Sequence, residues 1–130
     1  MLKLLVVDDN NRDRSVAREM SIWQDLNIQV LGEAANGQLA LEQIEHLGVP
    51  DIIITDVSMP YMDGITLSQK IQREYPRVHV LFMSYYEEFE YARNAISVHA
   101  DAYIVKPLRE KEVRAAVAAS NIGYTKAQGE

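Results

Sequence analysis

Polar residues that could do chemistry directly follow four short apolar runs of the sequence. They are Asp8 and Asp9 after the first run, then Asp56, then Ser84, and finally Lys106. Carboxylates bind hard divalent cations, an ionised carboxylate can act as a nucleophile, and a nearby ammonium keeps such a carboxylate charged. The four positions therefore predict an anionic, cation-binding pocket, provided that the fold brings them together.

The three carboxylates would repel one another at close range, and repulsion raises the pKa of a carboxyl group. A divalent cation removes this problem, and oxygen ligands in a chain without cysteine favour a hard ion, magnesium (Mg²⁺). An ammonium about 4 Å from a carboxylate gains on the order of 4 kcal/mol near a protein surface. Lys106 and the metal would keep Asp56 ionised and nucleophilic, while the Ser84 hydroxyl could donate to a phosphoryl oxygen.

The elements that must position these residues alternate along the chain. Short apolar runs typical of strands buried on both faces occupy residues 4–7, 52–54, 78–83 and 103–105, with a weaker, more edge-like run at 28–31. Apolar residues at helical spacing lie between and after them: Val16, Met20 and Trp23; Leu41, Ile44 and Leu47; Leu67 and Ile71; Phe89, Ala92 and Ile96; Val113, Ala116 and Val117. This alternation predicts an α/β fold, a doubly wound five-stranded parallel sheet with helices on both faces.

A flavodoxin-like strand order, 2-1-3-4-5, is expected for this sheet, and it rests in part on the family resemblance given below. Ligands of such sheets bind outside the carboxyl ends of the strands, where the strand order reverses. The first and third strands are then neighbours, so Asp8, Asp9 and Asp56 meet at one edge of the crevice. Ser84 and Lys106 approach from the other side.

Size and charge exclude several classes of protein. The 130 residues fit one domain, and the formal net charge of −6 argues against direct binding of nucleic acid, which needs a basic surface. No apolar run approaches the roughly 18 residues of a membrane span, and no signal-peptide pattern is present. We therefore expect a soluble cytoplasmic protein that does not enter a membrane.

Each candidate residue, taken alone, also has a purely structural explanation. Asp8 and Asp9 suit the N-terminus of a helix, Asp56 suits the turn before Pro60, and Ser84 suits a helix N-cap. Their occurrence together, each at a strand end and in this order, favours a functional site over four separate coincidences.

The motifs together resemble the receiver domain of bacterial two-component response regulators. They are Val6-Val7-Asp8-Asp9, the segment Asp-Val-Ser-Met-Pro-Tyr-Met-Asp-Gly at 56–64, Ser84, and Tyr103-Ile104-Val105-Lys106-Pro107. The resemblance covers residues 1–120 as one receiver domain and leaves 121–130 as a C-terminal tail or the start of a linker.

The resemblance implies a role for each matching residue. Asp56 matches the phosphoacceptor, which receives its phosphoryl group from a sensor histidine kinase. The metal ligands implied are Asp9 and Asp56 directly, Asp8 through water, and Ser58 through its backbone carbonyl.

It also implies a switch between two conformations. Ser84 matches the hydroxyl that moves to the phosphoryl group, Lys106 the lysine that pairs with it, and Tyr103 the aromatic residue that turns inward afterwards. The bond between Lys106 and Pro107 matches a peptide that is typically cis. Such a domain is a signalling protein rather than an enzyme, because it catalyses only its own phosphoryl transfer and dephosphorylation.

The implied partners follow from the same family. The face formed by the fourth helix, the fifth strand and the fifth helix would bind a partner or form a homodimer. The segment at 84–92, Ser-Tyr-Tyr-Glu-Glu-Phe-Glu-Tyr-Ala, resembles a subgroup whose full-length members carry an AraC-type helix-turn-helix domain. DNA would then be bound by a C-terminal domain absent from this sequence, and the output would be regulation of transcription.

Two residues depart from the family pattern. Tyr85 stands where the residue after the switch hydroxyl is usually small, so we expect slower phosphorylation and slower loss of phosphate. His99 stands where the family commonly has Gly at a helix end, so the helix is strained there or ends differently; an ordinary surface histidine explains it better than a pH sensor does.

Two other functions compete with the phosphorylated switch. A pseudo-receiver would bind its partner without phosphorylation, and Tyr85 would block its pocket. A haloacid-dehalogenase-like phosphatase would need an acid two residues after its nucleophile, and that position holds Ser58.

Overall fold

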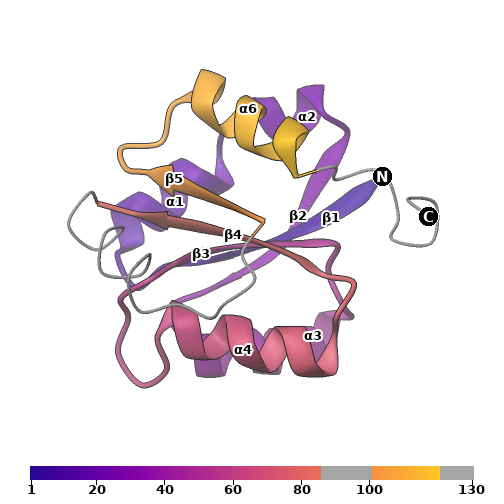
Figure 1. Ribbon diagram of the computed structural model, residues 1–130, viewed down its shortest axis with the longest axis vertical. Coiled ribbons are helices and arrows are strands. Elements are labelled where there is room, and N and C mark those ends of the chain that lie inside the picture. Colours follow the sequence, from indigo (N-terminus) through magenta and orange to yellow (C-terminus); the bar gives the residue numbers. More distant parts are fainter. Residues whose placement is uncertain (86–100, 121–130) are drawn as a thin grey trace.

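The computed structural model describes residues 1–85 and 101–120, and its centre is a parallel sheet in the order β2-β1-β3-β4-β5 (Figure 1). The strands are β1 (Leu2–Val7), β2 (Ile28–Ala34), β3 (Ile52–Asp56), β4 (His79–Ser84) and β5 (Ala102–Val105). Every pair of neighbouring strands is parallel. The predicted fold class and strand order are confirmed, and the weak run at 28–31 is indeed an edge strand.

Within residues 1–85 and 101–120, five helices cover the two faces of the sheet. They are α1 (Asn11–Arg18), α2 (Ile22–Asp25), α3 (Gly37–Leu47), α4 (Gly64–Glu74) and α6 (Glu110–Ala119). Figure 1 shows α3 and α4 on one face and α1, α2 and α6 on the other. The predicted helix with Phe89, Ala92 and Ile96, and the prediction for His99, lie outside the described residues.

Alternation along the strands divides the core into two layers. Successive side chains of a strand point to opposite faces, so Leu5 and Ile53 pack with Ile44 of α3 and Leu67 of α4. Their neighbours in sequence, Leu4, Val6, Ile52 and Ile54, pack with residues of the other three helices, including Ala17, Trp23, Val113 and Val117. Because helices cover both faces of the sheet, the side chains on both faces of a strand are buried, and the strands appear in the sequence as continuous apolar runs.

The prediction of one helix containing Val16, Met20 and Trp23 was wrong. The chain leaves the helix after Arg18 and forms the separate short helix α2, and Val16 is 48% exposed. The Trp23 indole N–H donates to the carbonyl of Ala17 at 2.7 Å, which satisfies a carbonyl near the end of α1 and draws Trp23 back over that helix. Leu47, expected on the buried face of α3, is also half-exposed because it is the last residue of that helix.

The loop after β3 returns the chain directly over the end of that strand. Gly64, the first residue of α4, donates its N–H to the carbonyl of Val57 at 2.8 Å. A Cβ atom at Gly64 would lie 2.0 Å from the carbonyl oxygen of Asp56, which is far inside contact distance. Only glycine therefore allows α4 to begin this close to Asp56, and the helix start helps to fix the strand end that carries Asp56.

Within residues 1–85 and 101–120, no helix combines the length and the apolar character that crossing a bilayer requires.

Candidate functional site

The ends of β1 and β3 bring three carboxylates together. Val7 and Thr55 are register partners in the two neighbouring strands, so the residues that follow them emerge side by side. One oxygen each of Asp8, Asp9 and Asp56 lies within 4.8 Å of the others. Asp8 is fully buried, Asp56 is nearly so, and Asp9 is exposed to solvent. The predicted convergence of these three acids is present in the structure.

Lys106 brings its positive charge to this cluster from the far edge of the sheet. Its Nζ lies 2.7 Å from Oδ2 of Asp8 and 3.0 Å from Oδ2 of Asp56, and the ammonium is buried. Burial alone lowers the pKa of Lys106, but the hydrogen bond that it donates to Asp8 and the charges of Asp56 and Asp8 outweigh this effect, so the pKa lies above its ordinary value. The side chain is therefore a permanent cation at neutral pH.

A fourth carboxylate, Asp13, completes the contacts of Lys106 and was missed in the sequence. Its Oδ2 lies 3.0 Å from the Lys106 ammonium. Asp13 belongs to the first turn of α1, where the side chain of Asn10 caps the helix by accepting from the Asp13 backbone N–H. An acid in the first turn of a helix is common because it complements the helix dipole. For that reason its type and position gave no sign of a role in the site.

Ser84 is the last residue of β4 and lies beside the end of β5. Its carbonyl accepts from the backbone N–H of Lys106 at 2.8 Å. Its hydroxyl is buried, and within residues 1–85 and 101–120 it has no hydrogen-bond partner. A buried hydroxyl without a partner costs free energy, and Ser84 directly follows Met83, the register partner of Asp56 in the neighbouring strand.

Tyr103 and Ser58 differ in how well the structure defines their predicted roles. Tyr103 lies on β5, and its ring centroid is 5.5 Å from that of Phe82. It packs at the margin of the core layer between the sheet and helices α3 and α4. Burial raises the pKa of its phenol. Ser58 is exposed in the loop after β3, and its role as a carbonyl ligand stays a prediction. The peptide between Lys106 and Pro107 is cis, as the resemblance implied.

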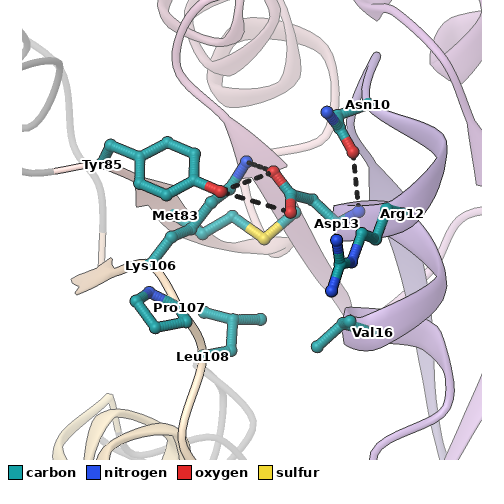
Figure 2. A pocket seen from close by; sticks show the side chains of 9 residues that line it. All are labelled: Asn10, Arg12, Asp13, Val16, Met83, Tyr85, Lys106, Pro107 and Leu108. Carbon is teal, nitrogen blue, oxygen red and sulfur yellow. Dashed lines mark hydrogen bonds and ion pairs between the residues drawn. The ribbon is translucent and has the colours of Figure 1, made fainter.

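The side chain of Tyr85 lies beside those of Lys106 and Asp13 at the candidate site (Figure 2). Its ring centroid is 5.2 Å from Nζ of Lys106, a distance typical of a cation–π contact. Its hydroxyl lies 3.4 and 3.3 Å from the two carboxylate oxygens of Asp13, whose charge, together with partial burial, raises the pKa of the phenol. A pocket of about 410 Å³ opens beside these three residues, and Arg12, Val16 and Leu108 contribute to its wall.

The donor set fits a hard divalent cation. The side chains that gather here, Asp8, Asp9 and Asp56, offer carboxylate oxygens, and the ammonium of Lys106 cannot by itself balance the charge of several acids. Mg²⁺ prefers oxygen ligands and retains several waters, so an exposed ligand such as Asp9 beside buried ones is suitable. The site can therefore hold a metal ion through Asp8, Asp9 and Asp56.

A doubly wound parallel sheet with an acidic, lysine-containing pocket at the carboxyl ends of its strands fits the receiver domains that the sequence motifs resemble. The comparisons with known proteins agree. Residues 4–118 match the family model of the response regulator receiver domain, and the chain belongs to this family.

Three relatives show the range of proteins that contain such a domain. YesN of Bacillus subtilis (strain 168), an uncharacterized transcriptional regulatory protein, is 36% identical over 87% of this chain and 30% of its own length. Protein-glutamate methylesterase/protein-glutamine glutaminase 1 of Methanospirillum hungatei JF-1 is 34% identical over 88% of this chain and 33% of its own. The crystallised REC domain of AraT, a response regulator from Geobacillus stearothermophilus, has a TM-score of 0.82 and 36% identity, covering 92% of each chain.

The chain thus spans about a third of the length of the curated relatives described here, and it corresponds to their receiver portion.

Proposed function

We propose that this chain is a phosphorylation-operated switch in which Asp56 accepts a phosphoryl group from a sensor histidine kinase. The observation that carries the proposal is the buried ion pair between Asp56 and Lys106, set among further carboxylates at the carboxyl ends of the strands. This arrangement pairs a buried carboxylate with a fixed cation and would place positive charge where phosphoryl charge develops.

Asp56, rather than its neighbour Asp8, is the acceptor in this proposal. Both oxygens of Asp8 are engaged by the protein, Oδ1 by the backbone N–H of Asn10 at 2.9 Å and Oδ2 by Lys106 at 2.7 Å. Asp8 is also fully buried at the end of β1. Asp56 ends β3 in the middle of the sheet, between β1 and β4, where an incoming donor can meet the residues of both strand ends.

Each neighbouring group would then serve the transfer. Mg²⁺ bound by Asp8, Asp9 and Asp56, with the Ser58 carbonyl, would supply positive charge to the phosphoryl oxygens. Lys106 would pair with one of these oxygens, and the Ser84 hydroxyl would donate to another. The buried position of that hydroxyl supports this assignment, because a phosphoryl oxygen would supply the acceptor that it needs.

Phosphorylation would be transmitted by a change in the balance between two conformations. A phosphoryl group adds charge and strong acceptors, which favour the conformation in which Ser84 has moved toward them. Tyr103, half-buried beside Phe82, would then turn into the space that Ser84 and the following loop leave. The altered face, which includes β5 and α6, would bind a partner or a second copy of the chain.

The output that this face controls is expected to be transcription. YesN is named a transcriptional regulatory protein, and the matched part of it is less than a third of its length. The resemblance of the segment at 84–92 makes an AraC-type domain the expected DNA-binding partner of this receiver, and the receiver itself, with a net charge of −6, would not touch DNA.

Incubation with acetyl phosphate and Mg²⁺, followed by intact mass measurement, tests the proposal. We expect one phosphoryl adduct, mapped to Asp56 by peptide analysis, that needs the metal and disappears in Asp56→Asn. Asp63→Asn is the matched control, since Asn can still cap α4 through the bond to the Thr66 N–H. Continuous release of phosphate without a lasting adduct would instead indicate a phosphatase.

A phosphorylation-independent pseudo-receiver is the second candidate, and one observation favours it. The ring of Tyr85 covers Lys106, and its hydroxyl reaches Asp13 on the opposite wall of the pocket. If this cover excluded the donor, neither acetyl phosphate nor a kinase would modify Asp56. The same mass experiment decides between the two, because a pseudo-receiver would show no adduct at any donor concentration.

A further inference from the structure

Asp13 contacts two groups that the proposed switch must move. Its carboxylate binds the Lys106 ammonium at 3.0 Å and lies 3.3 and 3.4 Å from the Tyr85 hydroxyl. Figure 2 shows Asp13 projecting from α1 toward the other two side chains, which come from the ends of β5 and β4. One carboxylate therefore links α1 to both strand ends.

The hydrogen bonds of Lys106 are already fully used. A lysine ammonium has three N–H donors, and it bonds to one oxygen each of Asp8, Asp13 and Asp56. A phosphoryl group on Asp56 would bring new acceptor oxygens. Lys106 can bind one of them only by giving up a partner that it has now.

Asp13 is the partner that costs least to give up. The side chain of Asp8 has no exposed surface, so water could not replace the ammonium there, whereas Asp56 stays beside Lys106 because the phosphoryl group is attached to its own carboxyl. The side chain of Asp13 is 20% exposed at the pocket wall, and water can replace Lys106 there. The exchange of Asp13 for a phosphoryl oxygen is therefore the least unfavourable rearrangement of the ammonium.

The same rearrangement affects Tyr85 through its neighbour in the chain. Ser84 and Tyr85 are joined by a peptide bond, so a movement of the Ser84 backbone toward a phosphoryl group would carry the Tyr85 backbone with it. The Tyr85 phenol is held only at long hydrogen-bond distances by Asp13. It would lose this contact when Ser84 moves or when Asp13 is resolvated.

We propose that Asp13 is a positioning residue that holds Lys106 and Tyr85 in the unphosphorylated arrangement and releases both when Asp56 is phosphorylated. The inference rests on the proposed function, since it assumes that a phosphoryl group is the competitor for Lys106. Asp13 acts as an internal anion that occupies the ammonium until a stronger acceptor arrives. It opposes the switch and so sets how much phosphorylation is needed to operate it.

Asp13→Asn tests this inference with little effect on the helix. The Asn10 cap uses the backbone N–H of Asp13, so the exchange leaves that bond intact. We expect beryllofluoride with Mg²⁺, a phosphoryl analogue, to bind Asp13→Asn about threefold to fivefold more tightly by isothermal titration, the upper range for a partly exposed ion pair. Asp25→Asn is the matched control: it removes the same charge from an exposed acid paired with Arg114 and should leave the affinity unchanged.

Two further variants separate positioning from a general effect of charge. Tyr85→Phe keeps the charge of Asp13 and the ring over Lys106 but removes the hydroxyl, and it should raise the affinity by a smaller factor. The double variant should bind no more tightly than Asp13→Asn, because both changes remove one restraint. NMR signals of the Tyr85 ring should already be displaced in unliganded Asp13→Asn, in the direction that beryllofluoride produces in the unaltered chain.

The failures of this inference and of the proposed function are distinguishable. If the unaltered chain forms the Asp56 adduct but Asp13→Asn binds beryllofluoride with equal or lower affinity, the inference is overturned and the proposed function stands. The inference is also overturned if the gains in beryllofluoride affinity of Asp13→Asn and Tyr85→Phe simply add in the double variant. If the unaltered chain takes up no phosphoryl group, both proposals fail together.

Discussion

Two clusters of charged side chains join distant parts of this chain, and they balance their charges in opposite ways. In the candidate site one ammonium, Lys106, bonds to three carboxylates. Between α1 and β2 the ratio is reversed, because the guanidinium groups of Arg14 and Arg18 both bind the carboxylate of Glu33. The Lys106 cluster has more negative than positive charge, whereas the arginines of the Glu33 cluster balance its carboxylate.

The Glu33 cluster is satisfied as it stands. Arg14 donates through Nε to Glu33 at 2.8 Å and through Nη1 to the carbonyl of Asp8 at 2.8 Å, while Arg18 binds the other Glu33 oxygen and also pairs with Glu19. The bonds from Arg18 and then Arg14 hold the pKa of Glu33 below its usual range. This cluster fastens α1 to β2 and steadies the backbone that carries the site, and it needs no further ion.

The difference separates a structural cluster from one prepared for ligands. Excess negative charge at a buried site raises the free energy of the folded chain. Such an arrangement persists where a bound cation or a reaction makes use of it. The predictions below test whether the two clusters differ in this way.

The largest effect is expected from Lys106→Met. This exchange removes the ammonium and leaves buried carboxylates without it, which should lower the free energy of unfolding by about 3 kcal/mol without Mg²⁺. Urea unfolding followed by fluorescence of Trp23, the one tryptophan of the chain and buried in the core, measures the loss. Lys111→Met is the matched control on the exposed start of α6. A loss no greater than that of the control would show that the cluster carries no excess charge.

The effect of Mg²⁺ should be smaller and confined to the candidate site. A ligand that binds only the folded chain at ten times its dissociation constant stabilises it by about 1.4 kcal/mol. Asp9→Asn removes a candidate ligand that is exposed, so it should weaken this stabilisation with little effect on the metal-free chain. Glu33→Gln should keep the whole of it. Equal stabilisation of all three chains in the same urea assay would place the metal elsewhere.

The sequence was sufficient for the fold and for the meeting of the strand-end residues. Every residue of β3 and β4 is buried, so the apolar runs were continuous and unambiguous. In a parallel sheet the carboxyl ends of neighbouring strands lie at one edge, so the strand order, which the family resemblance helped to supply, was enough to predict that Asp8 and Asp56 meet.

The contacts made by side chains from helices and loops could not be predicted in the same way. Whether Asp13 faces Lys106 depends on how α1 is rotated about its own axis, and the misjudged Val16 shows that the apolar spacing did not define this rotation. The position of the Tyr85 ring depends on a side-chain torsion at a strand end, which no periodicity reports. The break before α2 depends on the bond from Trp23 to Ala17, which joins residues of two elements.

The smallest effect is expected in the balanced cluster, and it should depend on pH. The pKa of Glu33 is lower in the folded chain than its unfolded value of about 4.3. A carboxyl group of this kind stabilises the fold above the unfolded pKa, and the contribution is lost as the pH falls through the folded pKa. At pH 7, Glu33→Gln should lower the free energy of unfolding by about 0.5–1 kcal/mol, a modest figure because solvent screens this half-exposed cluster.

At low pH, once the pH has fallen through the lowered folded pKa of Glu33, the unaltered chain and Glu33→Gln should become equally stable, because the carboxyl that the exchange removes is then protonated. Urea unfolding at a series of pH values measures this convergence. The exposed pair of Asp25 and Arg114 provides the control, and Arg114→Ala should change stability by less than about 0.5 kcal/mol at either pH. A Glu33→Gln variant as stable as the unaltered chain at pH 7 would mean that charge balance at this cluster contributes nothing. The contrast with the Lys106 cluster would then rest on burial alone.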